Sequence, residues 1–191
     1  MTVIPLRSAC GIALTPVAVE HAAELASLMR RERAHLQPYL PALGALASVD
    51  AARLHLAGAV ERARHHEIFE WHLFDGAVLC GAIRIKNIDR DDRKAQIGYF
   101  LASEFVGKGI VTSSLRSVLA FCFDTLRLNR LELRCAAGNA RSMAVAHRLG
   151  FVLEGVMRQD ELLNGVFVDQ HVFGLLRADF HSQPPSARCE T

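Results

Sequence analysis

Hydrophobic and polar positions follow two different periods along this chain, and the first part has the helical one. Residues 16–30 are rich in alanine and leucine and begin after Thr15-Pro16, a favourable helix entry. We therefore expect a first helix over 16–30. Prolines and a glycine between residues 36 and 48 indicate a loop, after which Ser48 is expected to open a second helix that ends near His66.

From residue 68 the period changes to that of strands. Residues 69–74 and 78–88 predict two strands joined at Asp75-Gly76, a favoured hairpin turn. The charged run 89–94 reads as a solvated loop, and residues 95–101 predict a third strand.

The second half of the chain predicts helices and strands in alternation. An amphipathic helix should follow Gly109, and residues 130–135 alternate strictly, as a strand does. Asn139 and Gly150 are the cap and stop signals of a short helix, and Asn164-Gly165 is a second hairpin turn between two strands. The order predicts one α/β (α+β) domain over residues 1–180, a mixed, mostly antiparallel sheet flanked by helices. Residues 181–191 are expected to be a disordered tail.

Composition narrows the class of protein. The 191 residues carry 22 basic and 20 acidic side chains, a net charge of +2, which argues against a nucleic-acid binder that relies on a basic field. The chain has no apolar run near the roughly 20 residues that span a bilayer, and its N-terminus lacks the features of a signal peptide. We therefore expect a cytoplasmic protein without a membrane partner. The five cysteines form no Cys-x-x-Cys pair and the nine histidines have no ligand spacing, so no metal site is expected.

The turn Gly107-Lys108-Gly109 stands directly before the predicted amphipathic helix. Backbone N–H groups at a helix start, together with the positive end of the helix dipole, suit an anion, and glycine permits a close approach. The turn could equally be purely structural. It matches neither the P-loop nor the dinucleotide-binding pattern, because Lys108 precedes Gly109 and the three spaced glycines are missing.

Six short motifs in a fixed order carry a specific resemblance. They are Ile97-Gly98-Tyr99, Gly107-x-Gly109-Ile110, Asn139-x-x-Ser142, Gly150-Phe151, Glu154-Gly155 and Leu163-Asn164-Gly165. Together they resemble the GNAT superfamily of N-acetyltransferases, and most closely its branch that acetylates serine or alanine at the N-terminus of ribosomal proteins. The resemblance covers nearly the whole chain to about residue 177.

The resemblance implies acetyl-coenzyme A as the acetyl donor and assigns residues to bind it. The pyrophosphate would lie on the backbone amides of residues 106–111, and the strand that carries Tyr99 would offer main-chain groups to the acetyl carbonyl. Asn139 would contact the pantetheine arm. The implied binding residues are Phe100, Leu101, Val106, Gly107, Lys108, Gly109, Ile110, Val111 and Asn139. The family often has Gln or Arg where this chain has Glu104, so side-chain help from that position is not expected.

Two residues are the catalytic candidates that the resemblance implies. Ser142 would protonate or stabilise the leaving thiolate, and Glu161 stands where this branch carries its proposed general base. Without the resemblance, Asn139 would be read as a helix cap, Ser142 as a solvent-facing residue and Glu161 as a solvated strand-end acid. Strand alternation predicts that Asp160 and Glu161 lie on opposite faces, so that only one of them faces the cleft.

The sequence alone does not identify the acceptor. The loops that would select it are 36–48 and the turn at 164–165, and their specificity cannot be deduced from a single sequence. The leading hypothesis is the N-terminal serine or alanine α-amine of a protein, such as a ribosomal protein. The alternatives are a small amine (an antibiotic, a polyamine or an amino acid) and a coenzyme A-binding sensor without catalysis. A homodimer is left open. The basic residues Arg30, Arg31, Arg33 and His35 could steer an acidic protein partner or could be an ordinary solvated helix end.

Overall fold

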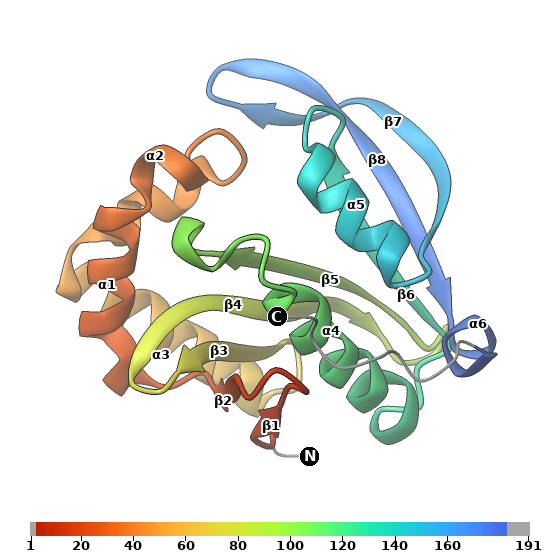
Figure 1. Cartoon of the computed structure of the whole chain (residues 1–191), viewed down its shortest axis with the longest axis horizontal. Helices are drawn as coiled ribbons and strands as arrows, with labels where there is room; N and C mark the ends of the chain where they lie inside the picture. Colours follow the sequence, from red (N-terminus) through yellow and green to blue (C-terminus); the bar gives the residue numbers. More distant parts are fainter. Residues whose placement is uncertain (1–2, 183–191) are drawn as a thin grey trace.

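The computed structural model describes residues 3–182, which form one eight-stranded sheet with helices on both faces (Figure 1). The strand order is β1-β2-β3-β4-β5-β6-β8-β7. Neighbouring strands are antiparallel except for β5 and β6, which are parallel. This architecture confirms the predicted α/β class and the mixed, mostly antiparallel sheet.

The elements alternate along the chain largely as the hydrophobic pattern predicts. The strands are β1 (Leu6–Arg7), β2 (Ala13–Pro16), β3 (Phe69–Asp75), β4 (Val78–Asp89), β5 (Lys94–Leu101), β6 (Arg130–Ala136), β7 (Val152–Leu163) and β8 (Val166–Leu176). The α-helices are α1 (Ala22–Arg31), α2 (Arg33–Leu36), α3 (Val49–Arg64), α4 (Ile110–Ala120), α5 (Ala140–Arg148) and α6 (Arg177–Ser182). Shorter helical turns are η1 (Val19–His21), η2 (Pro41–Ala47), η3 (Ser103–Phe105) and the π-helical η4 (Phe121–Thr125).

The start of the first helix differs from the prediction. Pro16 ends strand β2 instead of opening a helix, and α1 begins only at Ala22. Ile12 and Leu14 are 2% and 0% exposed, the period-two burial of a strand. The next residue, Val17, donates its N–H to the Glu70 carbonyl of β3 at 3.0 Å. Proline is tolerated here because it stands at the strand end.

The C-terminal boundary also differs. Helix α6 runs from Arg177 to Ser182, so the disordered tail expected from His181 begins inside a helix. Residues 183–191 of that expected tail lie outside the described residues.

Both predicted hairpins and the alternation of β6 are confirmed, but the first turn lies one residue later than predicted, because Asp75 pairs with Val78 and the turn residues are Gly76 and Ala77. Asn164 and Gly165 have φ angles of 50° and 84°, the left-handed pair of a tight hairpin turn, and they join β7 to β8. In β6 the side chains of Leu131, Leu133 and Cys135 are buried, as the alternation predicts.

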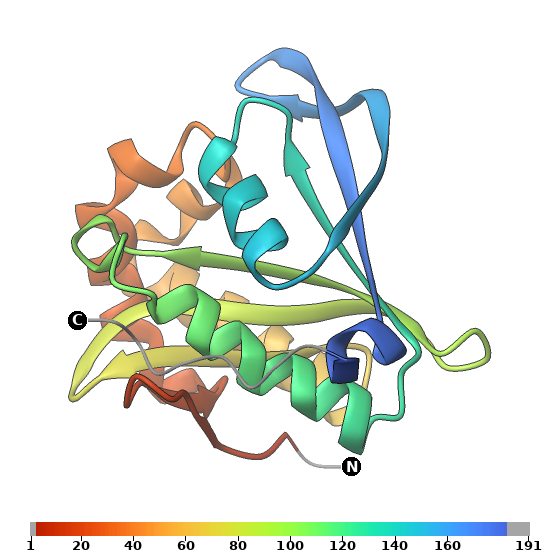
Figure 2. The same ribbon diagram turned by 45° about the vertical axis from the view of Figure 1, so that its right-hand side comes forward.

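The sheet has a helical layer on each face. On one face the ring of Trp71 in β3 packs edge-on against Phe121, directly after α4, with 5.3 Å between centroids. On the other face Arg84 of β4 contacts His55 of α3 at 3.2 Å. Figure 2 shows α4 and α5 together on the near side of the sheet.

The sheet opens in its middle, between the parallel strands β5 and β6. Their pairing runs from Lys94 opposite Arg130 to Ile97 opposite Leu133 and then ends, while β5 continues to Leu101. Beyond that point β5 stays with β4, and β6 turns away with β8 and β7 (Figures 1 and 2). The resulting V-shaped opening exposes one backbone edge of β5, and α5 lies beside it.

Within residues 3–182 no single helix is long and apolar enough to cross a membrane. One pair reaches the required length and composition together, η2 with α3, and it is bent by 118°.

Candidate active site

The glycine turn lies where the chain passes from η3 into α4. Gly107 and Gly109 have φ angles of 83° and 70°, which glycine adopts without steric cost, and Gly109 is the N-cap of α4. The first bond that returns to this cap joins the N–H of Ser113 to the Gly109 carbonyl at 3.0 Å. The N–H groups of residues 110–112 therefore have no carbonyl partner earlier in the helix. They point outward at the positive end of the α4 dipole, an arrangement that attracts an anion.

The side chains around this turn leave its backbone accessible. Ile110 and Val111 are buried at 6% and 8% exposure, so their side chains belong to the core and only their amides can reach a ligand. The Lys108 ammonium lies over the Phe105 ring, 5.4 Å from its centroid. This contact holds Lys108 back against η3, while Val106 is exposed.

Tyr99 of β5 and Ser142 of α5 meet at the opening of the sheet. The Tyr99 hydroxyl lies 3.1 Å from Ser142 Oγ, a hydrogen bond in which either oxygen can donate. Burial raises the pKa of Tyr99 to about 12, so the phenol keeps its proton at neutral pH. No local sequence signal predicts this contact, because the two residues are 43 positions apart.

Asn139 fixes the start of α5 beneath Ser142. Its Oδ1 accepts the backbone N–H of Ser142 at 3.1 Å, the capping bond that the sequence predicts. The Cys135 thiol also borders Ser142. Burial raises the pKa of this thiol, and its hydrogen bond with Ser142 opposes that effect. Ser142 is therefore held by its helix cap and is in contact with the partly buried Tyr99 and the buried Cys135.

Phe100 and Leu101 lie on β5 beyond the last residue that pairs with β6. Their strand runs close to β4 because Gly81 stands opposite Leu101: a Cβ on Gly81 would lie 2.3 Å from the Phe100 carbonyl oxygen. The Phe100 carbonyl therefore faces β4, while the opposite edge of β5 has no strand partner beyond Ile97.

Two neighbouring carboxylates face the same side of the hairpin, which overturns the alternation argument. Glu161 Oε2 accepts a hydrogen bond from Gln170 of β8, and Asp160 Oδ2 lies 3.4 Å from Arg134 Nη1 of β6. Gln170 and Arg134 share one face of the sheet, because Gln170 pairs with Ala136, two residues after Arg134. The expectation that Asp160 and Glu161 lie on opposite faces is therefore wrong.

A break in β7 is the physical reason. The register between β7 and β8 shifts between Met157 and Glu161, and Gln159 within this break has a φ of 52°. The break interrupts the period-two alternation, as a β-bulge does. The environments of the two acids also differ: Asp160 is ion-paired, whereas burial raises the pKa of Glu161 above its ordinary value, partly opposed by Lys86. A carboxylate with a raised pKa is the better candidate for a base.

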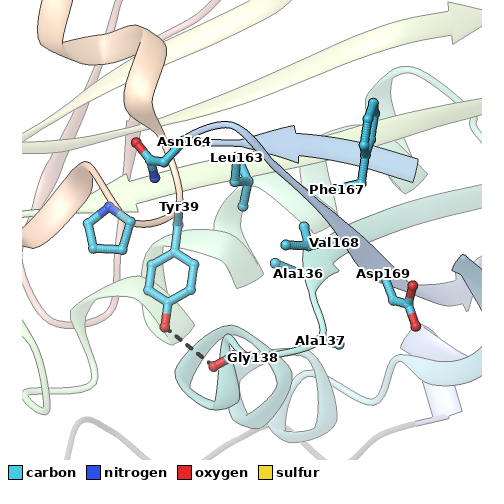
Figure 3. A pocket seen from close by; sticks show the side chains of 10 residues that line it. Tyr39, Ala136, Ala137, Gly138, Leu163, Asn164, Phe167, Val168 and Asp169 are labelled. Atoms are coloured by element: carbon cyan, nitrogen blue, oxygen red, sulfur yellow. Dashed lines mark hydrogen bonds between the residues drawn. The ribbon is translucent and has the colours of Figure 1, made fainter. Parts of the chain in front are cut away.

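A pocket of about 480 Å³ lies between the loop after α2 and the β7–β8 hairpin (Figure 3). It is lined by Pro38, Tyr39, Ala136, Ala137, Gly138, Leu163, Asn164, Phe167, Val168 and Asp169. Its walls are mainly apolar, and they include Val168, the strand partner of Glu161, and Gly138, which precedes the Asn139 cap. The pocket therefore borders both the α5 start and the carboxylate strand.

Two hydrogen bonds link the facing loops around this pocket. The Tyr39 hydroxyl donates to the Gly138 carbonyl at 3.3 Å, as Figure 3 shows, and Asn164 Nδ2 donates to the Gln37 carbonyl at 3.1 Å. The segment 36–48 and the turn at 164–165 are the two loops that the sequence predicts to select the acceptor. The structure brings them into contact.

Half of the basic cluster at the end of α1 is already engaged. Arg30 Nη1 donates to the Ala47 carbonyl at 2.7 Å, and Arg31 Nη2 lies 3.4 Å from Glu104 Oε1. These contacts favour a local structural role for both side chains over the steering of a partner. Among residues 3–182, no group of three or more His, Cys, Asp or Glu side chains is arranged to hold a metal ion.

Comparison with known proteins identifies the family. The acetyltransferase (GNAT) domain matches residues 12–152. "Putative ribosomal N-acetyltransferase YdaF" of Bacillus subtilis is 41% identical over 111 residues, 58% of this chain and 60% of that protein, so the match spans less than two thirds of that relative. The ribosomal-protein-serine acetyltransferase of Escherichia coli is 28% identical over 85% of this chain and 91% of that protein.

A solved structure extends the likeness to three dimensions. The ribosomal L7/L12 α-N-protein acetyltransferase RimL, crystallised with coenzyme A, superposes with a TM-score of 0.84 at 26% identity. The superposition covers 92% of this chain and 98% of that one. Because the family domain covers most of the sequence and the same fold recurs over nearly its whole length, this chain belongs to the GNAT family of acetyltransferases.

Proposed function

We propose that this protein transfers the acetyl group of acetyl-coenzyme A to the N-terminal α-amine of a serine or alanine residue in a cytoplasmic protein, such as a ribosomal protein. The observation that carries the proposal is the opening between β5 and β6, with Tyr99 and Ser142 bonded across it and the Gly107–Gly109 turn at the start of α4. The relatives that act on ribosomal proteins support the choice of acceptor.

The donor would bind along the opening. Its pyrophosphate would be held by the N–H groups of residues 110–112 and the preceding turn, where the helix dipole favours negative charge. The edge of β5 beyond Ile97, which has no strand partner, would accommodate the acetyl carbonyl, and N–H donors aimed at that oxygen stabilise the negative charge that develops in the transition state. Asn139 would contribute by fixing the start of α5.

The reaction is a direct attack of a neutral amine on the thioester carbonyl. A terminal α-amine has a pKa of roughly 7.7–8.0, so a modest base is sufficient. We assign that role to Glu161, whose burial raises its pKa, while Asp160 is held by Arg134. Glu161 would take the proton lost by the amine as the new C–N bond forms, directly or through a water molecule.

The tetrahedral intermediate then breaks its C–S bond and releases coenzyme A as a thiolate. Ser142 would give its hydroxyl proton to the sulfur, and the protonated Tyr99 phenol, 3.1 Å away, would restore it. The proton on Glu161 would return to solvent, and solvent would reprotonate the Tyr99 phenolate, so that each turnover yields an acetylated amine and free coenzyme A and restores the starting state.

The acceptor would enter through the pocket between Tyr39 and the β7–β8 hairpin. Its volume of about 480 Å³ holds only the first residues of a peptide, which fits recognition of a chain terminus. The same volume also fits a small amine, which remains the second candidate.

A competition experiment tests the proposal. Equal amounts of a Ser-initiated peptide, an Ala-initiated peptide, spermidine and an aminoglycoside are offered together with acetyl-coenzyme A, and the products are identified by mass. We expect the peptides to be acetylated first. Acetylation confined to the small amines would refute the N-terminal acceptor, and binding without release of free thiol with any amine would favour the sensor.

A further inference from the structure

A buried carboxylate lies outside the residues assigned above. Glu32 is 6% exposed and stands at the junction between α1 and α2. Its Oε2 accepts the backbone N–H of Ser103 at 2.8 Å, across 71 positions of sequence. Burying a carboxylate lowers the free energy of unfolding unless the group is paired or hydrogen-bonded. A carboxylate buried at this place therefore calls for a structural or functional explanation.

The hydrogen bond between Ser103 and Glu32 connects the α1–α2 junction to the segment that leads into the glycine turn. Ser103 is the first residue of η3, which ends at Phe105, directly before Val106 and Gly107. On the other side of this segment, the N–H of Ala102 donates to the Cys80 carbonyl of β4 at 2.7 Å. Glu32 therefore ties the first residue of η3 to α1, shortly before the turn, whose two glycines give it little stiffness of its own.

The neighbouring residue adds a second, weaker link to the same segment. Arg31 Nη2 lies 3.4 Å from Glu104 Oε1, with half of each side chain exposed (50% and 57%). An ion pair this exposed contributes little, so Glu32 is the principal contact. Glu104 occupies the position where the family often has Gln or Arg. In this chain Arg31 of α1 provides a positive charge beside that position.

We propose that Glu32 is a positioning residue for the donor site: it holds η3 so that the glycine turn and the first N–H groups of α4 keep the conformation that binds the pyrophosphate. This inference rests on the proposed function, because it takes the turn to be the pyrophosphate site. If the turn adopts its binding conformation only a tenth of the time without Glu32, the apparent Kd for acetyl-coenzyme A rises about tenfold.

The test compares Kd, KM and kcat of full-length variants. Glu32→Ala removes the acceptor and should raise Kd and KM for acetyl-coenzyme A on the order of tenfold, with kcat at saturation within about twofold of wild type. Glu32→Gln keeps an acceptor oxygen and should stay within about threefold of wild-type Kd. If Glu32 only stabilised the fold, Glu32→Ala would lower the melting temperature without raising Kd and KM at constant kcat. Glu32→Gln would then not restore binding.

A second variant removes the donor instead of the acceptor. Ser103→Pro deletes the N–H, and Ala102 before it already has φ −63° and ψ 147°, the conformation that precedes proline. Proline is also tolerated at the first position of a helical turn. Ser103→Pro should weaken binding as Glu32→Ala does, and the double variant should be no more than about twofold weaker than either single variant, because the same bond is lost.

Glu70→Ala is the matched control. Glu70 is also a buried carboxylate, 4% exposed and bonded to Arg84 at 2.5 Å, but it lies in β3, away from the turn. It should lower the melting temperature and leave Kd unchanged. Normal Kd in Glu32→Ala and Ser103→Pro, or additive losses in the double variant, would overturn the inference alone. A wild-type protein that does not bind acetyl-coenzyme A in calorimetry would overturn the donor site and this inference together.

Discussion

The Tyr99 hydroxyl lies 3.1 Å from Ser142 Oγ and joins strand β5 to helix α5 across the opening of the sheet. The bond places a protonated phenol behind the hydroxyl that we assign to the leaving thiolate. Two substitutions separate the roles of the two oxygens.

Ser142→Ala should lower kcat by roughly 10²–10⁴-fold if this hydroxyl transfers the proton to sulfur. Tyr99→Phe should cost less, about tenfold, because Ser142 remains and only its partner is lost. Both variants should bind acetyl-coenzyme A as wild type does, since neither side chain belongs to the glycine turn. Steady-state kinetics and calorimetry measure the two effects, and an unchanged kcat in Ser142→Ala would remove this residue from the mechanism.

Glu161→Gln should lower kcat strongly and remove the rise of rate with pH that belongs to the base. Because burial raises the pKa of Glu161, that rise should lie above the ordinary range of a glutamate. Asp160→Asn is the matched control, since Asp160 is bound to Arg134 and should keep most of the activity. The reverse ranking in pH–rate profiles would make Asp160 the base.

Gly109→Val should weaken acetyl-coenzyme A binding more than Lys108→Ala. Gly109 has a φ of 70°, which a β-branched residue adopts only with strain, and the added methyl groups would crowd the approach of the phosphates. Lys108 is held over Phe105, so its loss should change Kd by only a few-fold. Calorimetry on the two variants gives the ranking, and a larger loss in Lys108→Ala would show that the side chain matters more than the backbone.

Gly81→Ala should destabilise the protein by about 1–3 kcal/mol, because its Cβ would meet the Phe100 carbonyl oxygen at 2.3 Å and force β4 and β5 apart. Gly98→Ala on the facing strand is the control, since a Cβ there has no other atom within 4 Å. Urea unfolding measures both. Equal stability of the two variants would mean that the strands can separate at no cost.

Stability should fall as the pH drops below about 6.5, in part because of His72. This residue is 1% exposed, and burial lowers its pKa to about 3, with a further contribution from His21, whose Nδ1 lies 3.0 Å from that of His72. Between pH 6.5 and 3 the unfolded chain binds a proton at His72 that the folded chain does not, so stability is complete above this window and decreases within it. The slope for one such histidine approaches ~1.4 kcal/mol per pH unit.

Urea unfolding at pH 7.5 and pH 5.5 measures this loss, and His72→Gln provides the comparison. The variant lacks the titrating ring and should lose about 1 kcal/mol less than wild type between the two pH values. The same loss in both proteins would assign the pH dependence to other groups.

Local sequence was sufficient for much of the fold. The period-two pattern and the glycine-containing turn signals predicted both hairpins. At Asn164-Gly165 the turn type demands those residues, whereas the first turn lies one residue later than predicted, at Gly76-Ala77. The apolar face of α4 and the Asn139 cap could also be predicted, because they depend only on the spacing of residues within one helix. The sequence motifs also predicted the family, which the comparisons confirm.

Tertiary structure decided the features that depend on distant pairs. The residues around Pro16 predict a helix start, but pairing with β3 makes them a strand end. The break in β7 places Asp160 and Glu161 on one face, whereas an unbroken strand would place them on opposite faces. Tyr99 with Ser142 and Glu32 with Ser103 are 43 and 71 positions apart. No periodicity or local motif encodes such contacts. They arise only when the sheet opens between β5 and β6 and the helices pack on its two faces.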